Sequence, residues 1–401
     1  MSEWRNVAIG QLGEIVTGGT PRAAEYDSWG DDIDFLTPTD QREDSRDAKP
    51  ARRLSKVGAA RLSQRLLPPG AICFTCIGST IGKVSLVSRP TVTNQQINSI
   101  LPDPEVADSR FVYYLLKSCA DEIVQIASGS ATPIINKTQF GRFIVRVPER
   151  STQSAIGQVL GALDDKIAVN ERIAATAFEL MQSMWQSTAA GSIEMAPFSD
   201  LATIEKGLSY KGQWLGDGAP LVNLANFGVD GRFKASQLKY YSGEARDQHW
   251  VRSGDLVLAN TDLTQRREIL GQPALVAAGS DRALFSHHVF AVRPAANDDR
   301  ELLWLYGALR STAFRERAVT FATGTTVASL PRDAVLTHEV PMPPAENRLA
   351  WAATARTLID ASNSRVEENG VLSRLRDTLL PRLASGELRV KDVERQVSDA
   401  V

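Results

Sequence analysis

Cysteine, histidine and long apolar runs are scarce in this chain of 401 residues. The three cysteines, Cys73, Cys76 and Cys119, are too few and too clustered to form a disulfide framework, which favours a reducing compartment. No stretch approaches the roughly 18 consecutive apolar residues of a membrane span, and the first residues lack a basic segment followed by an apolar one. We therefore expect a cytoplasmic protein that has no membrane partner.

Patterns that would hold a metal ion are also missing. Cys73 and Cys76 have the spacing of half a zinc site, but they lie in a strand pattern that sends the two side chains to opposite faces. No second pair of cysteines or histidines accompanies them, so we expect both to pack in the core. All four histidines lie in the second half of the chain: His249, His287, His288 and His338.

One string resembles a phosphate-binding loop, from Gly78 to Lys83. It has three rather than four residues between its glycines, and Val84 stands where a serine or threonine would bind magnesium. A nucleotide-dependent enzyme built on this loop is one alternative, and it predicts that Lys83→Ala abolishes turnover; we expect that substitution only to disturb a loop. No glycine fingerprint for S-adenosylmethionine or a dinucleotide follows a strand pattern. We therefore expect no catalytic residue, cofactor or metal on this chain.

Charge is balanced overall but uneven locally. The net charge of −2 gives no general attraction to nucleic acid, so any such binding must come from patches. Residues 49–65 hold six cations and no acid, which suits phosphate binding, although a solvated helix face is the alternative. These cations are Lys49, Arg52, Arg53, Lys56, Arg61 and Arg65. The matching region of the second half, with Arg232, Lys234, Lys239 and Arg246, also contains acids.

What the chain does have is an internal duplication. Residues 200–343 repeat residues 11–148 in loosely matched form. Gly129 and Gly324 are 195 residues apart, as are Val145 and Val340. Earlier matches drift by a few residues, as loop insertions would cause. With 43% hydrophobic residues and a length typical of two to three domains, the repeat predicts two domains on a shared scaffold.

Each copy combines short strand patterns with a helix pattern, which predicts an α+β fold. The strand patterns of the first copy are residues 35–37, 71–75, 83–87 and 97–101, and those of the second are 221–222, 256–258, 274–276 and 289–292. One helix is expected at 111–126 and its counterpart at 302–319.

A long helix pattern follows each copy. The first can be capped by Ser151 or Thr152 and carries apolar residues at spacings of three and four, with Asn170 as one polar position in the seam. The second runs from about Ala345 to Leu380, where Pro381 is expected to stop it. We expect the helices to pair antiparallel like a coiled coil; the alternative is that each only covers its own domain. The predicted boundaries are 1–150 and 193–344 for the domains, and 151–192 and 345–401 for the helical segments.

Polar residues recur at matched loops of the two copies. Asn, Gln, Arg and His can hydrogen-bond base edges, whereas Ser, Thr, Lys and glycine amides suit phosphates, although many of these residues are also common in turns. In the first copy the candidates are Thr17, Gly18, Gly19, Thr20, Thr39, Arg52, Arg53, Lys56, Ser79, Thr80, Asn94, Gln95, Gln96, Ser130, Thr132, Asn136 and Lys137. In the second copy they are Lys206, Ser209, Tyr210, Lys211, Asn223, Asn226, Asn260, Thr261, Arg266, Arg267, His287, His288, Thr325 and Thr326.

Several strings carry a family resemblance. They are residues 12–21 (LGEIVTGGTP), 78–84 (GSTIGKV), 93–98 (TNQQIN), 153–157 (QSAIG) and 379–388 (LLPRLASGEL). With the order of domain, helix, domain and helix, the chain resembles the DNA specificity subunit (HsdS) of type I restriction-modification systems. It departs from that pattern in the second copy, where Ser286-His287-His288 stands in place of Asn-Gln-Gln.

The resemblance implies a function without catalysis on this chain. Two target-recognition domains would each read one half of a bipartite site in double-stranded DNA, and the helices would set the spacing. Two methylation subunits would dock on the helices and bring S-adenosylmethionine, and two restriction or translocase subunits would join them. The alternative is a two-domain protein-binding scaffold without DNA specificity.

Overall fold

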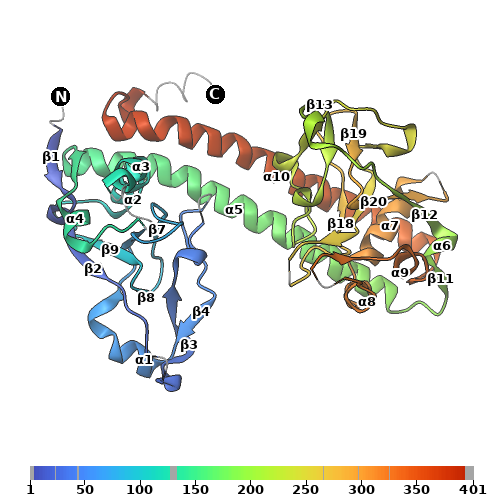
Figure 1. Ribbon diagram of the computed structural model, residues 1–401, viewed down its shortest axis with the longest axis horizontal. Helices are drawn as coiled ribbons and strands as arrows, with labels where there is room; N and C mark the ends of the chain where they lie inside the picture. The colour runs from blue at the N-terminus through green and yellow to red at the C-terminus, as the bar shows by residue number, and fades with distance from the viewer. Residues whose placement is uncertain are drawn as a thin grey trace. The chain divides into compact units, whose positions relative to one another are not determined.

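The computed structural model describes residues 4–22, 24–42, 45–126, 133–264, 266–296, 298–324 and 326–392 (Figure 1). The chain divides into two compact units. The first unit contains the residues up to 171 and those from 366, and the second contains residues 172–365. Among the described residues, no helix is long and apolar enough to cross a membrane.

The first unit contains two four-stranded sheets and a separate strand pair. One sheet is antiparallel, in the order β2 (Gly13–Thr17), β9 (Ile97–Pro102), β6 (Ile72–Thr75), β7 (Val84–Leu86). The other has the order β4 (Arg52–Leu54), β3 (Trp29–Leu36), β8 (Thr91–Thr93), β5 (Leu66–Leu67), with β3 and β8 parallel. The pair is β1 (Arg5–Ala8) with β10 (Ile144–Val147).

The second unit repeats this topology and has one additional strand pair. Its antiparallel sheet is β12 (Ala202–Lys206), β20 (Val289–Pro294), β16 (Leu256–Ala259), β18 (Pro273–Leu275). Its other sheet is β14 (Lys239–Tyr241), β13 (Leu215–Val222), β19 (Arg282–Phe285), β15 (Trp250–Arg252), with β13 and β19 parallel. The strand pairs are β11 (Met195–Pro197) with β22 (Glu339–Pro341), and β17 (Thr261–Asp262) with β21 (Ala328–Ser329). Even the register irregularity between β3 and β4 recurs between β13 and β14, so the predicted duplication is confirmed.

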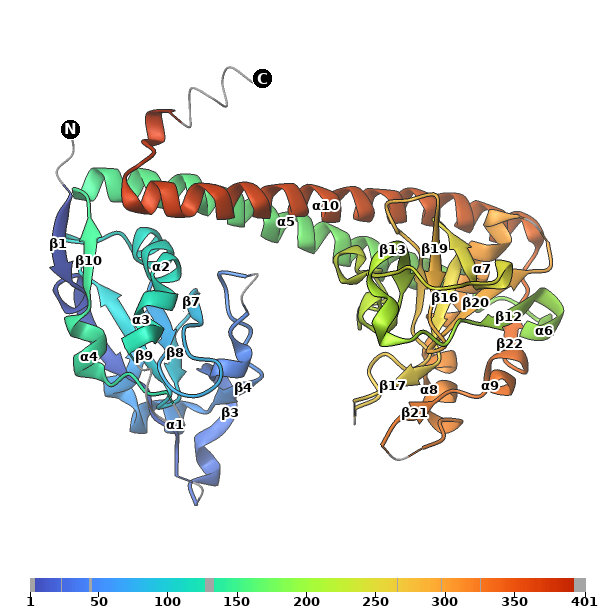
Figure 2. The same ribbon diagram turned by 45° about the horizontal axis from the view of Figure 1, so that its top comes forward.

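Short helices cover these sheets. The first unit has α1 (Lys56–Arg61), α2 (Ser109–Ser118), α3 (Ala120–Ile126) and α4 (Lys137–Arg142), and the second has α6 (Phe198–Leu201), α7 (Asp299–Leu309), α8 (Thr312–Thr320) and α9 (Arg332–Leu336). Helix α2 packs on β6, β7 and β9 (Figure 2). The core of the first unit lies between that sheet, α2 and the two long helices, where Phe74, Phe111 and Tyr114 are buried.

Two of the helix predictions were wrong in detail. The single helix expected at 111–126 is divided at Cys119, and the one at 302–319 is divided at Arg310 and Ser311. Ser311 accepts a hydrogen bond from the backbone N–H of Phe314, so it caps a new helix instead of continuing the old one. The basic run at 49–65 is not one helix face, because it is divided among strand β4, helix α1 and a 3₁₀ turn (Ser63–Arg65).

The long helices are α5 (Arg150–Ala189) and α10 (Ala345–Ser385), and they lie side by side within each unit (Figures 1 and 2). In the first unit, the Asn170 side-chain amide donates to that of Asn369 at 2.9 Å. In the second, the Trp351 indole N–H donates to the Met181 carbonyl at 3.3 Å. Residue numbers rise along one helix as they fall along the other, so the antiparallel pairing is confirmed. Each long helix also contributes residues to the cores of both units, so the alternative that each only covers its own domain is wrong.

Pro381 does not stop α10, contrary to expectation. The helix continues through it to Ser385, and Gly386 then takes a positive φ of 80°. A proline inside a helix removes one hydrogen bond. Leu379, Leu380 and Leu383 are buried in the core of the first unit, and this packing keeps the last turn helical despite the missing bond.

Candidate nucleic-acid interface

In the first unit, backbone hydrogen bonds gather the predicted loops at one edge of the sheets. The Gly19 N–H donates to Thr93 at 2.8 Å, and the Asn94 N–H donates to Leu36 at 3.0 Å. The Cys76 N–H donates to Gln96 at 2.8 Å. Loops that follow β2, β3, β6 and β8 are therefore neighbours. We call residues 17–20, 37–40, 76–82, 94–96 and 133–137 the first loop edge.

The second unit has the same connections. The Leu208 N–H donates to Phe285 at 2.9 Å, and the Ser286 N–H donates to Val222 at 2.9 Å. The Asn260 N–H donates to His288 at 3.0 Å. The second loop edge consists of residues 206–211, 223–226, 260–264, 266–267, 286–288, 323–324 and 326–330. The matched bonds make residues 94–96 equivalent to residues 286–288, so Asn-Gln-Gln and Ser-His-His occupy one place in the two copies.

Gly18 and Gly207 allow two backbone segments to approach each other closely at these edges. A Cβ atom on Gly18 would lie 2.0 Å from the Asn94 carbonyl oxygen, and one on Gly207 would lie 2.2 Å from that of Phe285. No side chain fits such an approach. These glycines let the strand end pass close to the loop.

Residues 94–96 of the first loop edge, which we call the amide loop, are held in place by side-chain hydrogen bonds. Asn94 donates from its side-chain nitrogen to the Gln96 side chain at 3.0 Å and accepts from the Gln96 backbone N–H at 3.1 Å. The Thr20 hydroxyl donates to the side-chain oxygen of Gln95 at 2.7 Å, and Gln95 is exposed. An exposed amide of this kind can donate and accept at a base edge.

Residues 286–288 of the second loop edge, which we call the histidine loop, present imidazole rings in place of the amides. The rings of His287 and His288 lie 3.8 Å apart between centroids, and Tyr210 is 6.2 Å from His287. Burial lowers the pKa of both histidines, and for His288 the nearby cationic groups add to this effect. Both rings are therefore neutral at pH 7, and each offers one donor and one acceptor.

The tautomer of His288 follows from its neighbours. The Thr261 hydroxyl donates to the Asn260 side chain at 2.7 Å, and its oxygen lies 3.2 Å from His288 Nδ1. Because the hydroxyl proton is already used, His288 donates from Nδ1. Its Nε2 then remains as a hydrogen-bond acceptor.

Some candidate residues support the loops and are themselves buried. Asn223 caps a 3₁₀ turn (Leu224–Asn226) and donates to the Asn226 side chain at 2.9 Å, and Asn226 donates to the Lys234 carbonyl at 2.8 Å. Asn136 also has a supporting role but is exposed: it caps α4 by accepting from the Gln139 N–H at 2.9 Å.

The basic run has several different environments. Arg53 forms an ion pair with the buried Asp34 at 2.9 Å, and Arg61 pairs with Asp27 at 2.6 Å. Arg65 donates to the Gly18 carbonyl at 2.7 Å, which puts its guanidinium group at the first loop edge. The guanidinium of Arg52 lies 4.8 Å from the centre of the Trp29 ring.

The remaining candidates differ in exposure and position. Exposed ones are Thr39, Lys56, Ser79, Lys137, Lys206, Ser209, Lys211, Arg266 and Thr326, and half-buried ones are Thr17, Thr80 and Arg267. Of all these, Lys56 lies away from the loop edges, at the start of α1. Ser130, Thr132 and Thr325, and Gly129 of the repeat, lie outside the described residues.

Lys239 was not among the predicted contact residues, and Arg65 was predicted only as part of the basic run. The Lys239 ammonium lies 5.5 Å from the centre of the Tyr210 ring and 3.4 Å from its hydroxyl. Only the strand register brings Lys239 to Tyr210, which is 29 positions away in sequence. A cation opposite a buried strand has no local sequence signature.

The residues that resemble catalytic or metal motifs have structural roles. Cys73 and Cys76 lie in separate core clusters, as their opposite faces predict, and burial raises the thiol pKa to about 12 and about 11. Lys83 donates its ammonium to the Gln41 carbonyl at 3.1 Å. Within the described ranges, no group of three or more His, Cys, Asp or Glu residues is placed to hold a metal ion.

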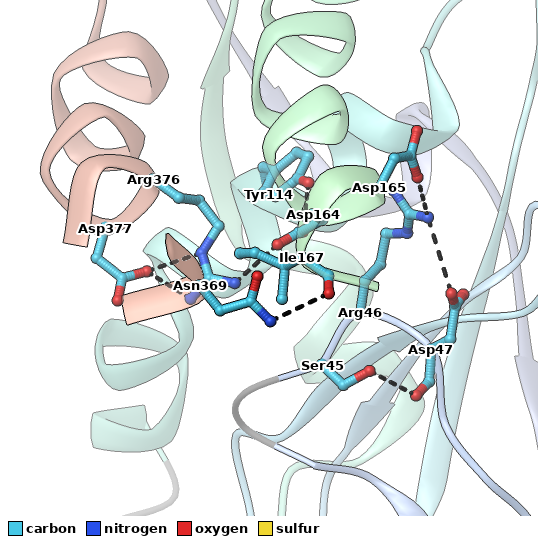
Figure 3. A network of polar contacts seen from close by, with 10 residues as sticks. All are labelled: Ser45, Arg46, Asp47, Tyr114, Asp164, Asp165, Ile167, Asn369, Arg376 and Asp377. Atoms are coloured by element: carbon cyan, nitrogen blue, oxygen red, sulfur yellow. Dashed lines mark hydrogen bonds and ion pairs between the residues drawn. The ribbon is translucent and has the colours of Figure 1, made fainter. Parts of the chain in front are cut away.

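A buried polar network joins the long helices to helix α2 and the loop after β3 within the first unit (Figure 3). Asp164 of α5 pairs with Arg376 of α10 at 2.7 Å, both almost fully buried, and accepts from the Tyr114 hydroxyl of α2. Arg46, in the loop after β3, reaches Asp165 at 2.7 Å. Burial raises the pKa of the Tyr114 phenol, and the Asp164 carboxylate raises it further, so Tyr114 stays a donor.

Comparison with known proteins shows which proteins this chain is similar to. Residues 1–177 match the family described as type I restriction modification DNA specificity domain. A 150-residue stretch is 36% identical to the specificity subunit of the type I restriction enzyme HindI of Haemophilus influenzae, covering 37% of this chain and 32% of that protein. The specificity subunit of the type I restriction enzyme MjaIX of Methanocaldococcus jannaschii is 24% identical, over 98% of this chain and 95% of its own.

The fold comparison covers 95% of the chain. The crystal structure of the type I restriction-modification S subunit of M. genitalium matches with a TM-score of 0.59 and 16% identity, covering 95% of this chain and 96% of that one. Residues 1–177 are thus similar to the DNA specificity domain of type I restriction-modification systems. The chain as a whole is similar to the specificity subunits of type I restriction enzymes and has the fold of one.

Proposed function

We propose that this chain is the sequence-specific DNA-binding subunit of a type I restriction-modification complex, and that each loop edge reads one half of a bipartite site. The main support is that two topologically equivalent edges present different polar groups at the same place. Gln95 offers an exposed amide, where His287 offers an imidazole. Identical scaffolds with different hydrogen-bonding groups are what two unlike half-sites require.

In this proposal, one set of residues holds the loops in place and a different set contacts the bases. Gly18 and Gly207 set the loops close to the strand ends, and Asn223 and Asn226 hold a turn beside the histidine loop. Since the net charge of −2 supplies no general attraction, affinity depends on cations at the edges. Arg65 and Lys211 are such cations.

The long helices set the distance between the half-sites in this proposal. Helix α5 has 40 residues, so it is about 60 Å long at 1.5 Å per residue. That exceeds the roughly 34 Å of one DNA turn, so helices of this size can separate two half-sites. Exposed apolar residues of the helices, among them Val169, Ile173 and Val371, are available to dock methylation subunits.

The chemistry belongs to the partners. Two methylation subunits would bind S-adenosylmethionine and flip the target adenine, and two restriction or translocase subunits would join the complex. This chain determines where on the DNA they act.

The test is methylation by purified partners with and without this chain. We expect adenine methylation at a defined bipartite sequence only when the chain is present. Methylation of the same sites in its absence would refute the proposed function. A gel-shift series at graded salt with competitor DNA would separate sequence-specific binding from a protein scaffold that ignores DNA.

A further inference from the structure

Each unit has an exposed cation at the same strand position. In β4, Arg52 pairs with Phe35, and in β14, Lys239 pairs with Leu221. Phe35 and Leu221 are equivalent, because each precedes the last residue of the long central strand that runs parallel to β8 or β19. The flanking sequences, Arg-Arg-Leu and Lys-Tyr-Tyr, show no similarity that would reveal the match.

The two cations are held in similar ways. The guanidinium of Arg52 lies 4.8 Å from the Trp29 ring and 5.2 Å from the Phe35 ring. The Lys239 ammonium lies over Tyr210 at 5.5 Å. A cation placed on an aromatic ring keeps its charge but loses part of its freedom. Each is therefore more ordered than a free surface side chain.

Their charges also remain available, unlike those of their neighbours. Arg53 is neutralised by Asp34, and Arg61 by Asp27. Arg52 and Lys239 are exposed, and no carboxylate in the described ranges pairs with either of them. An ordered, exposed and unneutralised cation suits a phosphate.

Both cations lie beside the loops that carry the reading residues. Next to Arg52 in the chain, the Ala51 N–H donates to the Asp40 carboxylate of the first loop edge at 3.1 Å. Lys239 contacts Tyr210, which lies 6.2 Å from His287 in the second loop edge. A phosphate contact at each cation would hold the DNA backbone of that half-site in place while the neighbouring loop edge contacts the bases.

We propose that Arg52 and Lys239 are matched phosphate anchors, one for each DNA half-site. The inference rests on the proposed DNA-binding function. It adds that the anchors supply affinity without sequence preference, and that the loops at 94–96 and 286–288 supply the preference. The competing explanation is that both side chains only cover aromatic surface.

The experiment measures DNA binding by the chain assembled with its methylation subunits, for the wild type and for Arg52→Met and Lys239→Met. Methionine keeps the apolar cover over the rings and removes the charge. Arg52→Lys and Lys239→Arg keep the charge, and Arg5→Gln and Arg252→Gln remove exposed cations at sites away from the loop edges. Duplexes carry the target site, or one base change in either half-site, over a range of salt concentrations.

We expect each methionine variant to lower the slope of log affinity against log salt by about 0.9, with a loss on the order of threefold to tenfold. The ratio of affinities for target and altered duplexes should stay at the wild-type value, and the charge-keeping and control variants should bind like wild type. An unchanged slope would overturn the proposal, and so would a loss confined to particular base pairs. Absence of sequence-specific binding by the wild-type complex would instead refute the proposed function, so the two failures are distinguishable.

Discussion

At the scale of single residues, the proposed function implies that the histidine loop should give the second half-site a pH response that the first lacks. All four histidines belong to the second unit. The pKa values of His287 and His288 lie below the ordinary value because of burial, so both rings are neutral at pH 7 and become protonated only as the pH falls below their lowered pKa values. Protonation converts the His288 Nε2 acceptor into a donor.

We therefore predict that discrimination at the second half-site is constant above neutral pH and falls as the pH is lowered below about 6.5, the ordinary histidine value, while discrimination at the first stays constant. The measurement is the affinity ratio for duplexes altered in one half-site. A ratio is needed because protonation also strengthens general attraction to DNA. The double variant His287→Gln and His288→Gln should abolish the response, and equal changes in both half-sites would contradict the prediction.

Gly18 gives a second prediction at this scale. The Cβ atom of Gly18→Ala would meet the Asn94 carbonyl at 2.0 Å, and the strand end must shift to relieve the clash. We expect a loss of about 1–3 kcal/mol in the free energy of unfolding and weaker reading of the first half-site. Denaturant unfolding measures it. Gly212→Ala is the control, because a Cβ there meets nothing within 4 Å, and an equal loss in both variants would refute the steric explanation.

At the scale of elements, the buried pair of Asp164 and Arg376 joins α5 to α10 within the first unit. Their side chains are only 6% and 5% exposed. Arg376→Met would leave the carboxylate buried without its cation, so we predict a loss of about 3–5 kcal/mol in the free energy of unfolding. Adding Asp164→Leu should recover part of it, because it removes the unpaired carboxylate but leaves the Tyr114 hydroxyl without its acceptor. Denaturant unfolding of both variants checks this, and a double variant no better than the single one would contradict it.

The exposed pair of Arg382 and Glu387 is the matched control, because its side chains are 47% and 66% exposed. Exposed ion pairs contribute little, so Arg382→Met should change the free energy of unfolding by less than about 1 kcal/mol. A large loss there would mean that helix α10 itself, and not the buried pair, limits stability.

Elements show how far sequence alone could go. Strand patterns, the duplication and both long helices were predictable, because apolar periodicity and repeated spacing are local signals. The continuation of α10 past Pro381 could not be predicted from the sequence. It depends on the packing of Leu379, Leu380 and Leu383 against core residues that are distant in sequence. The candidate site was predictable only as a set of loops. Whether Asn226 is buried in a turn or Lys239 lies over Tyr210 depends on strand register, which has no local signal.

At the scale of the whole molecule, one chain carries two copies of a loop edge that agree in backbone and differ in polar side chains. The matched hydrogen bonds at Asn94 and Ser286 show that the backbone is shared. Under the proposed function, sequence preference therefore belongs to the side chains that differ. Each edge should be alterable without changing what the other one reads.

The most direct test of this account is genome-wide mapping of methylated adenines in cells that carry the methylation subunits with either the wild-type chain or the variant Gln95→Ala and Gln96→Ala. The account predicts a bipartite motif with two different halves at fixed spacing for the wild type. For the variant it predicts a first half with relaxed sequence, while the second half and the spacing stay the same. A single-sided motif, or a variant that alters both halves together, would contradict it.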